Sequence, residues 1–152
     1  MAYIEGKKEA ECVLCRKVEG EDDRANLVVH RGQLAYVIMN LYPYNPGHLM
    51  VAPYAHVSAL GDLPEAALGE LMRLARQCTE ILQGVMAPDG FNLGMNLGEV
   101  AGAGIADHLH LHVVPRWAAD TNFMPVLGET RVLPEDLATT YDKLCAAWGE
   151  VE

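Results

Sequence analysis

Three histidines alternate with apolar residues in the stretch "HLHLHVV", which runs from His108 to Val114. Alternation with a period of two is typical of a β-strand, in which residues i, i+2 and i+4 point to the same face. His108, His110 and His112 are therefore expected to share one face, while the apolar residues between them are buried on the other. The rest of the chain must supply a core for that apolar face, and this requirement constrains the fold.

The length and composition of the chain predict one folded domain. A chain of 152 residues is long enough for one packed core and too short for two ordinary ones. Hydrophobic residues make up 51% of the sequence and charged residues 21%, which is typical of a globular protein. No internal repeat or linker divides the sequence, so a single domain over residues 1–152 is expected.

Apolar patterning predicts further strands around the histidine strand. Two β-branched runs at 26–30 and 33–40 are separated by a tight turn, and a third strand is expected at 48–52, after a loop fixed by two prolines. A fourth strand is expected at 90–98, where apolar residues alternate with Asn and Gly. Short connections between consecutive strands favour an antiparallel sheet.

Two amphipathic helices complete the pattern. The first is expected to begin at an Asp62 N-cap, with Glu65 completing a capping box, and to end around residues 84–88. The second carries apolar residues at helical spacing from Leu137 to Trp148, after an irregular stretch. The sequence therefore predicts an α+β fold, with an antiparallel sheet of about five strands and two main helices.

The first part of the chain, about residues 1–25, is expected to be a poorly ordered arm interrupted by a Cys12-x-x-Cys15 knuckle. In a reducing compartment such a pair is typical of a metal or redox site rather than of a structural disulfide. No thioredoxin-like βαβ pattern surrounds the pair, which disfavours a redox site. A pair of free thiols on a loose arm is the other alternative, and a tetrahedral zinc site needs two further ligands.

The net charge of -10 disfavours nucleic acids as partners, because a phosphate backbone is repelled and no stripe of Lys or Arg offsets the charge. A small anionic ligand remains compatible with this charge where a site gathers local donors. The longest apolar run is well short of the ~18 residues that suggest a membrane span. The first residues lack the apolar core of a signal peptide, so a cytoplasmic protein with no membrane partner is expected.

The three histidines allow three interpretations: an incidental solvated face, one zinc ion bound by all three rings, or a division of roles along the strand. The first and third rings lie ~13 Å apart in an extended strand, which one ion cannot easily bridge. A histidine is a nucleophile when one ring nitrogen is unprotonated and the other is held as a donor. Glycines 98, 102 and 104 precede the strand and let backbone N–H groups approach an anion closely. This combination favours attack on phosphorus.

The stretch "HLHLHVV" resembles the motif of the histidine-triad (HIT) family of nucleotide hydrolases and transferases. The similarity extends from "CVLC" through "NPGHLMVAPYAH" and "NLGMNLG" to "PRW". "LYPYNPGHLMV" and "DHLHLHVVPRWAADTNF" are especially similar to the branch that phosphorolyses diadenosine tetraphosphate. The resemblance implies a HIT-like fold and a homodimer that acts on small nucleotides, with inorganic phosphate as a possible second substrate.

The resemblance also implies roles for individual residues. His110 would attack the α-phosphorus and become nucleotidylated, with its ring oriented by the backbone carbonyl of His108. His112 and His48 would contact the phosphoryl oxygens and the leaving group. The candidate substrate-binding residues are Asn40, Asn96, Gly102 and Gly104. The family often binds a structural zinc ion, and the matching residues here are Cys12, Cys15, His56 and His108.

One position departs from the family pattern. Many hydrolases of the family carry a glutamine four residues before the triad, where this chain has Gly104. The position leaves open whether water or phosphate completes the reaction. The expected function is nucleotidyl transfer on dinucleoside polyphosphates, with phosphorolysis favoured. The alternatives are a hydrolase of dinucleoside polyphosphates or nucleoside phosphoramidates, a nucleotide-binding regulatory module, and a hydrolase that uses zinc directly.

Overall fold

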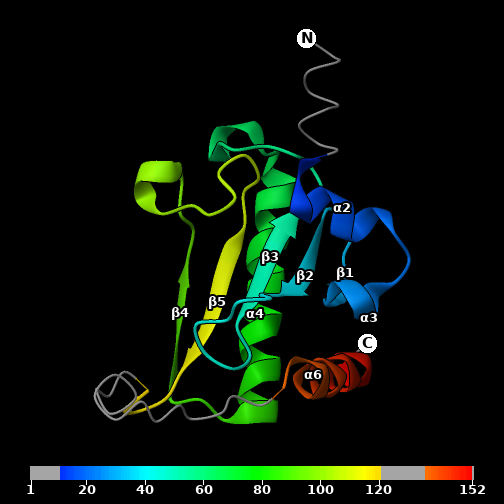
Figure 1. Cartoon of the computed structure of the whole chain (residues 1–152), viewed down its shortest axis with the longest axis vertical. Helices are drawn as coiled ribbons and strands as arrows, with labels where there is room; N and C mark the ends of the chain where they lie inside the picture. Colours follow the sequence, from blue (N-terminus) through cyan, green and yellow to red (C-terminus); the bar gives the residue numbers. More distant parts are fainter. Residues whose placement is uncertain (1–10, 121–135, 152) are drawn as a thin grey trace.

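A five-stranded antiparallel sheet with the order β1-β2-β3-β5-β4 forms the centre of the computed structural model, which describes residues 11–120 and 136–151 (Figure 1). The strands are β1 (Val28–Arg31), β2 (Ala35–Met39), β3 (Leu49–Pro53), β4 (Gly90–Gly94) and β5 (Leu111–Arg116). The helices are α2 (Val13–Glu19), α3 (Asp23–Asn26), α4 (Glu65–Met86) and α6 (Leu137–Val151), with single turns η1 (Leu60–Asp62) and η2 (Glu99–Ala101). The predicted α+β fold is confirmed.

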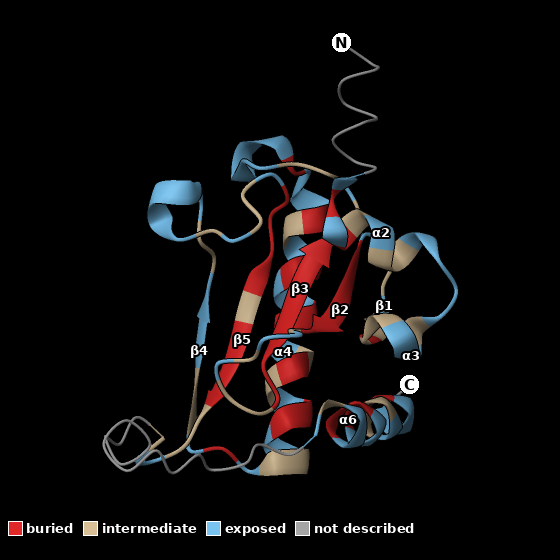
Figure 2. Cartoon of the chain, in the orientation of Figure 1, coloured by how far each residue is buried: buried red, intermediate tan, exposed pale blue. Residues whose placement is uncertain are grey.

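The sheet separates two hydrophobic clusters. Because successive residues of a strand point to opposite faces, consecutive residues belong to different clusters. In β2, Val37 and Met39 pack toward α4, whereas Tyr36 and Ile38 pack in the smaller cluster under α2. Figure 2 shows the buried residues concentrated in β2, β3 and one side of α4. The larger cluster continues into α6 through Leu144 and its neighbours. The sheet therefore has one face covered by the long helix and one face left partly open beside α2.

The histidine strand lies between β3 and β4 and has the predicted two faces. Leu109, Leu111 and Val113 belong to the cluster under α4 and are at most 7% exposed. His110 and His112 alternate with them and therefore project to the opposite face. Pairing of β3 with β5 sets Met50 opposite His112 in antiparallel register. The apolar half of the strand is thus the part that anchors the histidines.

The N-terminal arm differs from the expectation over the residues that the structure describes. From residue 11 onward the chain forms α2 and α3 rather than a poorly ordered segment. Leu14 is 1% exposed, and its carbonyl accepts a hydrogen bond from the Tyr36 hydroxyl at 2.9 Å. Helices this short depend on such tertiary contacts, which local sequence does not reveal.

The predicted capping box at Asp62 is also wrong. Asp62 lies in η1, and α4 begins at Glu65 after a Pro64 N-cap that makes no side-chain hydrogen bond. The residue before a proline is restricted to extended conformations. Leu63 accordingly has φ -93° and ψ 133°, which prevents a helix from starting at that residue.

The histidine strand β5 and its neighbour β4 are both shorter than predicted. Strand β4 ends at Gly94 instead of continuing to residue 98, and β5 begins only at Leu111. The backbone before β5 has other partners: Leu109 N–H donates to the Val57 carbonyl at 2.8 Å, and the His108 carbonyl accepts from a side chain. These interactions replace ladder hydrogen bonds and end the pairing.

The last helix, α6, forms where the apolar spacing predicted it, with Tyr141, Leu144 and Trp148 buried. The end of α4 at Met86 also agrees with the predicted limit. Most of the irregular stretch expected before the last helix, residues 121–135, lies outside the described residues. Among the helices that the structure describes, none has the length and apolar character needed to cross a bilayer.

Candidate functional site

Three imidazoles meet on the face of the sheet away from α4. His48 comes from the residue just before β3, and His110 and His112 come from the neighbouring strand β5 and the residue before it. The rings of His110 and His112 lie 4.9 Å apart, and those of His48 and His112 lie 5.0 Å apart. His48 and His110 are almost fully buried, at 1% and 6% exposure. The antiparallel pairing of β3 with β5 is what brings these distant segments together.

A backbone carbonyl fixes the protonation pattern of His110. Its Nδ1 lies 2.9 Å from the carbonyl oxygen of His108. A carbonyl can only accept, so Nδ1 carries a proton, and in the neutral ring the lone pair is then on Nε2. The ring of His110 therefore presents an unprotonated nitrogen, which is the form that a nucleophile requires.

A backbone N–H fixes the opposite pattern in His48. The Tyr44 N–H donates to His48 Nδ1 at 3.2 Å, and the Asn40 amide nitrogen lies 3.5 Å from the same atom. The proton of His48 is therefore on Nε2, which donates to His112 Nδ1 over 2.8 Å. His112 in turn must carry its proton on Nε2. Within the described residues, the Nε2–H of His112 has no partner and can donate to a ligand beside Nε2 of His110.

Burial keeps this pair of rings neutral. Desolvation, with smaller contributions from His112 and His110, lowers the pKa of His48 from 6.5 to about 4. Desolvation and the neighbouring His110 also lower the pKa of His112. Removing an imidazolium from water without a counter-charge is unfavourable, so each ring gives up its second proton. The tautomers of His48 and His112 described above are therefore the ones present at neutral pH.

We expect His48 to make stability depend on pH in the acid range. The unfolded imidazole takes up a proton near pH 6.5, whereas the folded one does so only near pH 4. Between these values the unfolded state binds more protons, so stabilisation that is complete above pH 6.5 is lost as the pH falls toward 4. By pH 5 the loss should be about 2 kcal/mol. Urea unfolding of the wild type and of His48→Gln at pH 7 and pH 5 measures it. Equal pH dependence of the two proteins would contradict the assignment.

The loop before His48 depends on a glycine. Gly47 has φ +80°, and a Cβ added there would lie 2.7 Å from the Met86 sulfur and 3.0 Å from Leu82 Cδ2. Only glycine adopts this conformation freely and also fits against the end of α4. Gly47→Ala should lower the free energy of unfolding by about 1–3 kcal/mol and displace His48. Gly61→Ala is the matched control, since a Cβ at Gly61 meets nothing within 4 Å. Equal thermal stability of the two variants would refute this expectation.

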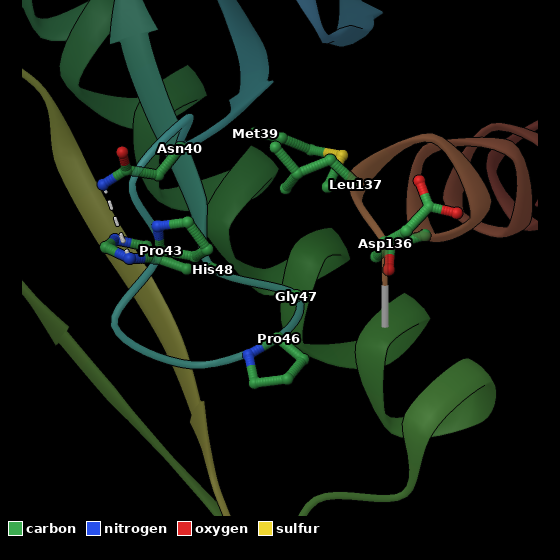
Figure 3. A pocket seen from close by; sticks show the side chains of 9 residues that line it. Met39, Asn40, Pro43, Pro46, Gly47, His48, Asp136 and Leu137 are labelled. Atoms are coloured by element: carbon green, nitrogen blue, oxygen red, sulfur yellow. Dashed lines mark hydrogen bonds between the residues drawn. The ribbon is translucent and has the colours of Figure 1, made fainter. Parts of the chain in front are cut away.

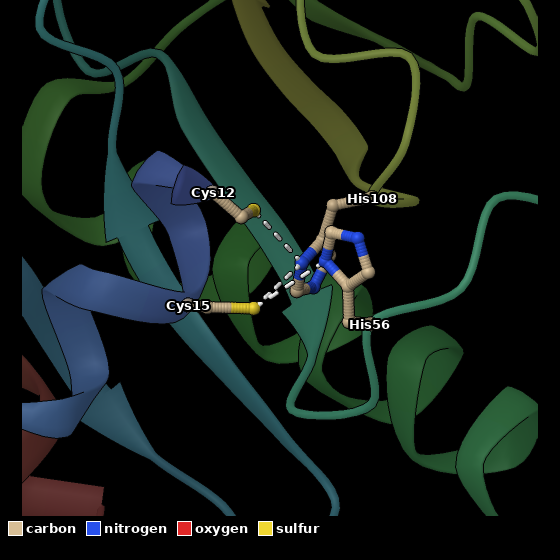
Figure 4. A group of neighbouring side chains, drawn as sticks. All are labelled: Cys12, Cys15, His56 and His108. Atoms are coloured by element: carbon tan, nitrogen blue, oxygen red, sulfur yellow. Dashed lines mark hydrogen bonds between the residues drawn. The ribbon is translucent and has the colours of Figure 1, made fainter. Parts of the chain in front are cut away.

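Two cysteines and two histidines form a second cluster at the other end of the histidine strand (Figure 4). Cys12 and Cys15 come from the start of α2, His56 follows β3, and His108 precedes β5. Their candidate ligand atoms all lie within 4.8 Å of one another. His108 Nδ1 is 3.4 Å from the Cys12 sulfur and 3.5 Å from the Cys15 sulfur, and His56 Nδ1 is 3.5 Å from the Cys15 sulfur.

These four residues fit a tetrahedral metal site. Zinc bonds of about 2.3 Å to sulfur and 2.0–2.1 Å to nitrogen imply ligand-to-ligand distances of roughly 3.3–3.8 Å. The three sulfur–nitrogen distances given above, 3.4, 3.5 and 3.5 Å, fall in this range. His108 Nε2 lies 2.8 Å from the Pro53 carbonyl, which holds its proton and turns Nδ1 toward the sulfurs. The cluster could therefore hold a metal ion. It takes only His108 from the triad, which disfavours one ion bound by all three rings.

Of the remaining predicted site residues, Asn40 and Gly104 each lie beside one of the two clusters, whereas Asn96 and Gly102 contact each other. Asn40 lies beside His48, as described above. Asn96 Nδ2 donates to the Gly102 carbonyl over 3.4 Å, and Gly102, with φ +92°, ends η2. Gly104 lines a cavity of about 420 Å³ that also contains Cys12 and His56. The structure thus places Gly104 beside the cysteine–histidine cluster rather than in contact with the rings of His48 and His112.

Two features of the site were not predicted from the sequence. The Tyr44 N–H, which decides the protonation of His48, follows from the loop conformation and has no signature in residue type. Arg116 donates from two nitrogens to the Asp120 carboxylate and from a third to the Asn92 side chain. Its charge is therefore largely neutralised within the protein.

The family model described as the HIT domain matches residues 21–119. The chain belongs to the histidine-triad (HIT) family. It is 48% identical over 127 residues to a Mycobacterium tuberculosis protein named AP-4-A phosphorylase, a match that covers 84% of this chain and 65% of that protein. A Schizosaccharomyces pombe protein named bis(5'-nucleosyl)-tetraphosphatase is 33% identical over 93 residues, covering 61% of this chain and 50% of that protein. The chain thus spans less than two thirds of the length of either relative.

The fold of this HIT protein also agrees with solved structures. A zinc-bound histidine triad family protein from Mycobacterium smegmatis superposes with a TM-score of 0.74 at 22% identity. The match covers 94% of this chain and 96% of that one. At this identity the likeness establishes the HIT fold of the chain and no more than the fold.

Proposed function

We propose that this HIT protein transfers a nucleotidyl group from dinucleoside polyphosphates, such as diadenosine tetraphosphate, through a covalent intermediate on His110. The observation that carries the proposal is the hydrogen bond from His110 Nδ1 to the His108 carbonyl, because it leaves Nε2 unprotonated. An imidazole whose lone pair is fixed on one nitrogen needs no separate base to become nucleophilic. The 48% identical relative named AP-4-A phosphorylase supports the choice of substrate.

In the first step the His110 Nε2 lone pair forms a bond to the α-phosphorus. The bond between that phosphorus and the bridging oxygen breaks, and its electron pair leaves with the second nucleotide, as ATP when the substrate is diadenosine tetraphosphate. The His112 Nε2–H donates a hydrogen bond to the phosphoryl or leaving oxygens, where negative charge increases in the transition state. His48 holds the other nitrogen of His112 and so keeps that donor in place.

In the second step orthophosphate attacks the phosphorus of adenylyl-His110. The phosphorus–nitrogen bond breaks, its electron pair returns to Nε2, and the product is ADP. Water in place of phosphate would give AMP. The observation that favours phosphate is the 48% identical relative, whose name describes a phosphorylase. Gly104, which stands where many hydrolases of the family have glutamine, is consistent with this choice.

We also propose that Cys12, Cys15, His56 and His108 hold a structural zinc ion. A site with four protein ligands leaves no open position for a substrate. The bound ion would supply a cross-link between α2 and the segment that carries His110. His110, His112 and His48 would then perform the transfer, and zinc would stabilise the scaffold that orients them.

The products of a single assay test the reaction. The protein is incubated with diadenosine tetraphosphate with and without orthophosphate, and the nucleotides are separated by chromatography. We expect ATP and ADP in equal amounts when phosphate is present, and a much slower reaction when it is absent. AMP and ATP at a rate that does not depend on phosphate would identify a hydrolase instead. Tight binding without any product would indicate the nucleotide-binding module.

A further inference from the structure

An exposed tyrosine covers the histidine pair. The ring of Tyr44 stacks on that of His48 with centroids 5.0 Å apart and planes at 30°, and it lies 6.4 Å from the ring of His112. Tyr44 is nevertheless 74% exposed. One face of the ring is therefore occupied by imidazole, while the other is open to solvent. The open face offers a flat apolar surface on which a second aromatic ring can stack.

The loop that carries this ring is held in place. The Asn45 amide donates to the Pro115 carbonyl and to the Asp120 carboxylate, both at 2.9 Å. Figure 3 shows the loop curving past a cavity of about 270 Å³, which its two prolines line together with Met39 and Leu137. Tyr44 is not part of that lining. Because the loop is anchored, a ligand that stacks on Tyr44 has little backbone entropy to overcome.

Arg116, the basic residue of β5, does not supply unpaired charge for binding on this face. Arg116 lies on the same face of β5 as His112, by the period of two, but Asp120 and Asn92 engage its guanidinium. A polyanion that extends past His112 therefore does not meet an unpaired arginine from β5. Stacking on Tyr44 is an interaction that the described residues do offer to the far end of such a ligand, since base–aromatic stacking tolerates a polar environment.

We propose that the open face of Tyr44 stacks on the second nucleobase of a dinucleoside polyphosphate, the base that departs with the leaving nucleotide. The inference rests on the proposed function, in which the phosphorus under attack lies at His110 Nε2 and the leaving group passes His112. The ring centroid of Tyr44 lies 6.4 Å from that of His112, past which the leaving group extends in this proposal. A chain of several phosphates covers this distance. Tyr44 is then a specificity residue that distinguishes dinucleoside from mononucleoside polyphosphates.

The test compares two substrates that differ only in the second nucleoside: diadenosine tetraphosphate and adenosine tetraphosphate. Tyr44→Leu should lower kcat/KM for the dinucleotide roughly 5- to 50-fold, and change it less than about twofold for the mononucleotide. Tyr44→Phe should keep the wild-type values, because the ring face is retained. Tyr42→Leu is the matched control, as Tyr42 is 81% exposed in the same loop and its backbone N–H bonds to Asn40.

An equal loss on both substrates would show that Tyr44 only shields His48 and would overturn the proposal. So would a selective loss in Tyr42→Leu as large as in Tyr44→Leu. A second readout separates this inference from the proposed function. Calorimetry in the His110→Asn background measures binding of both nucleotides without turnover, and Tyr44→Leu should weaken only the dinucleotide. If the wild type cleaves neither substrate, the reaction is wrong, while this binding ratio still decides the role of Tyr44.

Discussion

Replacing His110 with asparagine should reduce turnover of diadenosine tetraphosphate by at least about 10³-fold. The asparagine Nδ2 can donate to the His108 carbonyl as the His110 Nδ1–H does over 2.9 Å, so the local structure is kept. What the variant lacks is the unprotonated nitrogen that attacks phosphorus. Binding of the dinucleotide should change no more than about threefold, because the other donors of the site remain. Steady-state kinetics and calorimetry measure the two quantities.

A histidine outside the site provides the matched control. His30 stacks on Trp148 with ring centroids 5.0 Å apart, at the edge of the sheet formed by β1. His30→Asn removes an imidazole of the same size and should leave kcat within about twofold of the wild type, since no step uses it. Near-normal turnover by His110→Asn would contradict the mechanism. A large loss in both variants would point to a general effect on folding.

Replacing Cys15 with serine should release zinc and lower the free energy of unfolding by about 2–5 kcal/mol. The Cys15 sulfur lies 3.5 Å from both His56 Nδ1 and His108 Nδ1, so its thiolate and the two histidines would bind the same ion. Serine is a poor zinc ligand, and the remaining three residues would bind the ion far more weakly. Metal analysis of the purified protein and urea unfolding, with and without chelator, give the two measurements.

Cys145 offers a control with the same substitution. It is a partly buried free cysteine on α6, 3.9 Å from the Val29 carbonyl and outside the metal cluster. Cys145→Ser should keep its zinc and change stability by less than about 1 kcal/mol. Chelator should first lower the stability of the wild type, with kcat retained by the protein that is still folded. Immediate loss of activity at unchanged stability would show that zinc takes part in the reaction.

The sequence predicted which face of the sheet the histidines occupy more accurately than it predicted where the neighbouring elements begin and end. Strand geometry leaves one choice for alternate residues, so the face shared by His110 and His112 followed from spacing alone. The start of α4 was not predicted correctly, because the restriction that Pro64 places on Leu63 outweighs the capping potential of Asp62. Local rules of similar strength competed at that point, and only the folded structure shows which prevailed.

The sequence predicted which residues form the candidate site, but not which histidine nitrogens carry the protons. Cys12 and His108 are 96 residues apart, and their pairing followed from resemblance to the family rather than from any local pattern. The tautomer of His48 depends on the N–H of Tyr44, which every residue except proline possesses, so no sequence signal marks it. The neutralised charge of Arg116 likewise depends on how Asp120 folds back onto it.

The covalent intermediate is the most direct test of the proposed reaction. Wild-type protein is mixed with diadenosine tetraphosphate in the absence of phosphate and quenched within the first turnover in alkaline denaturant, where a phosphorus–nitrogen bond survives. Mass spectrometry of the peptides should find one adenylyl group on His110 and none in the His110→Asn variant. Turnover without any adenylylated protein, or an adenylyl group on a different residue, would contradict nucleophilic catalysis by His110.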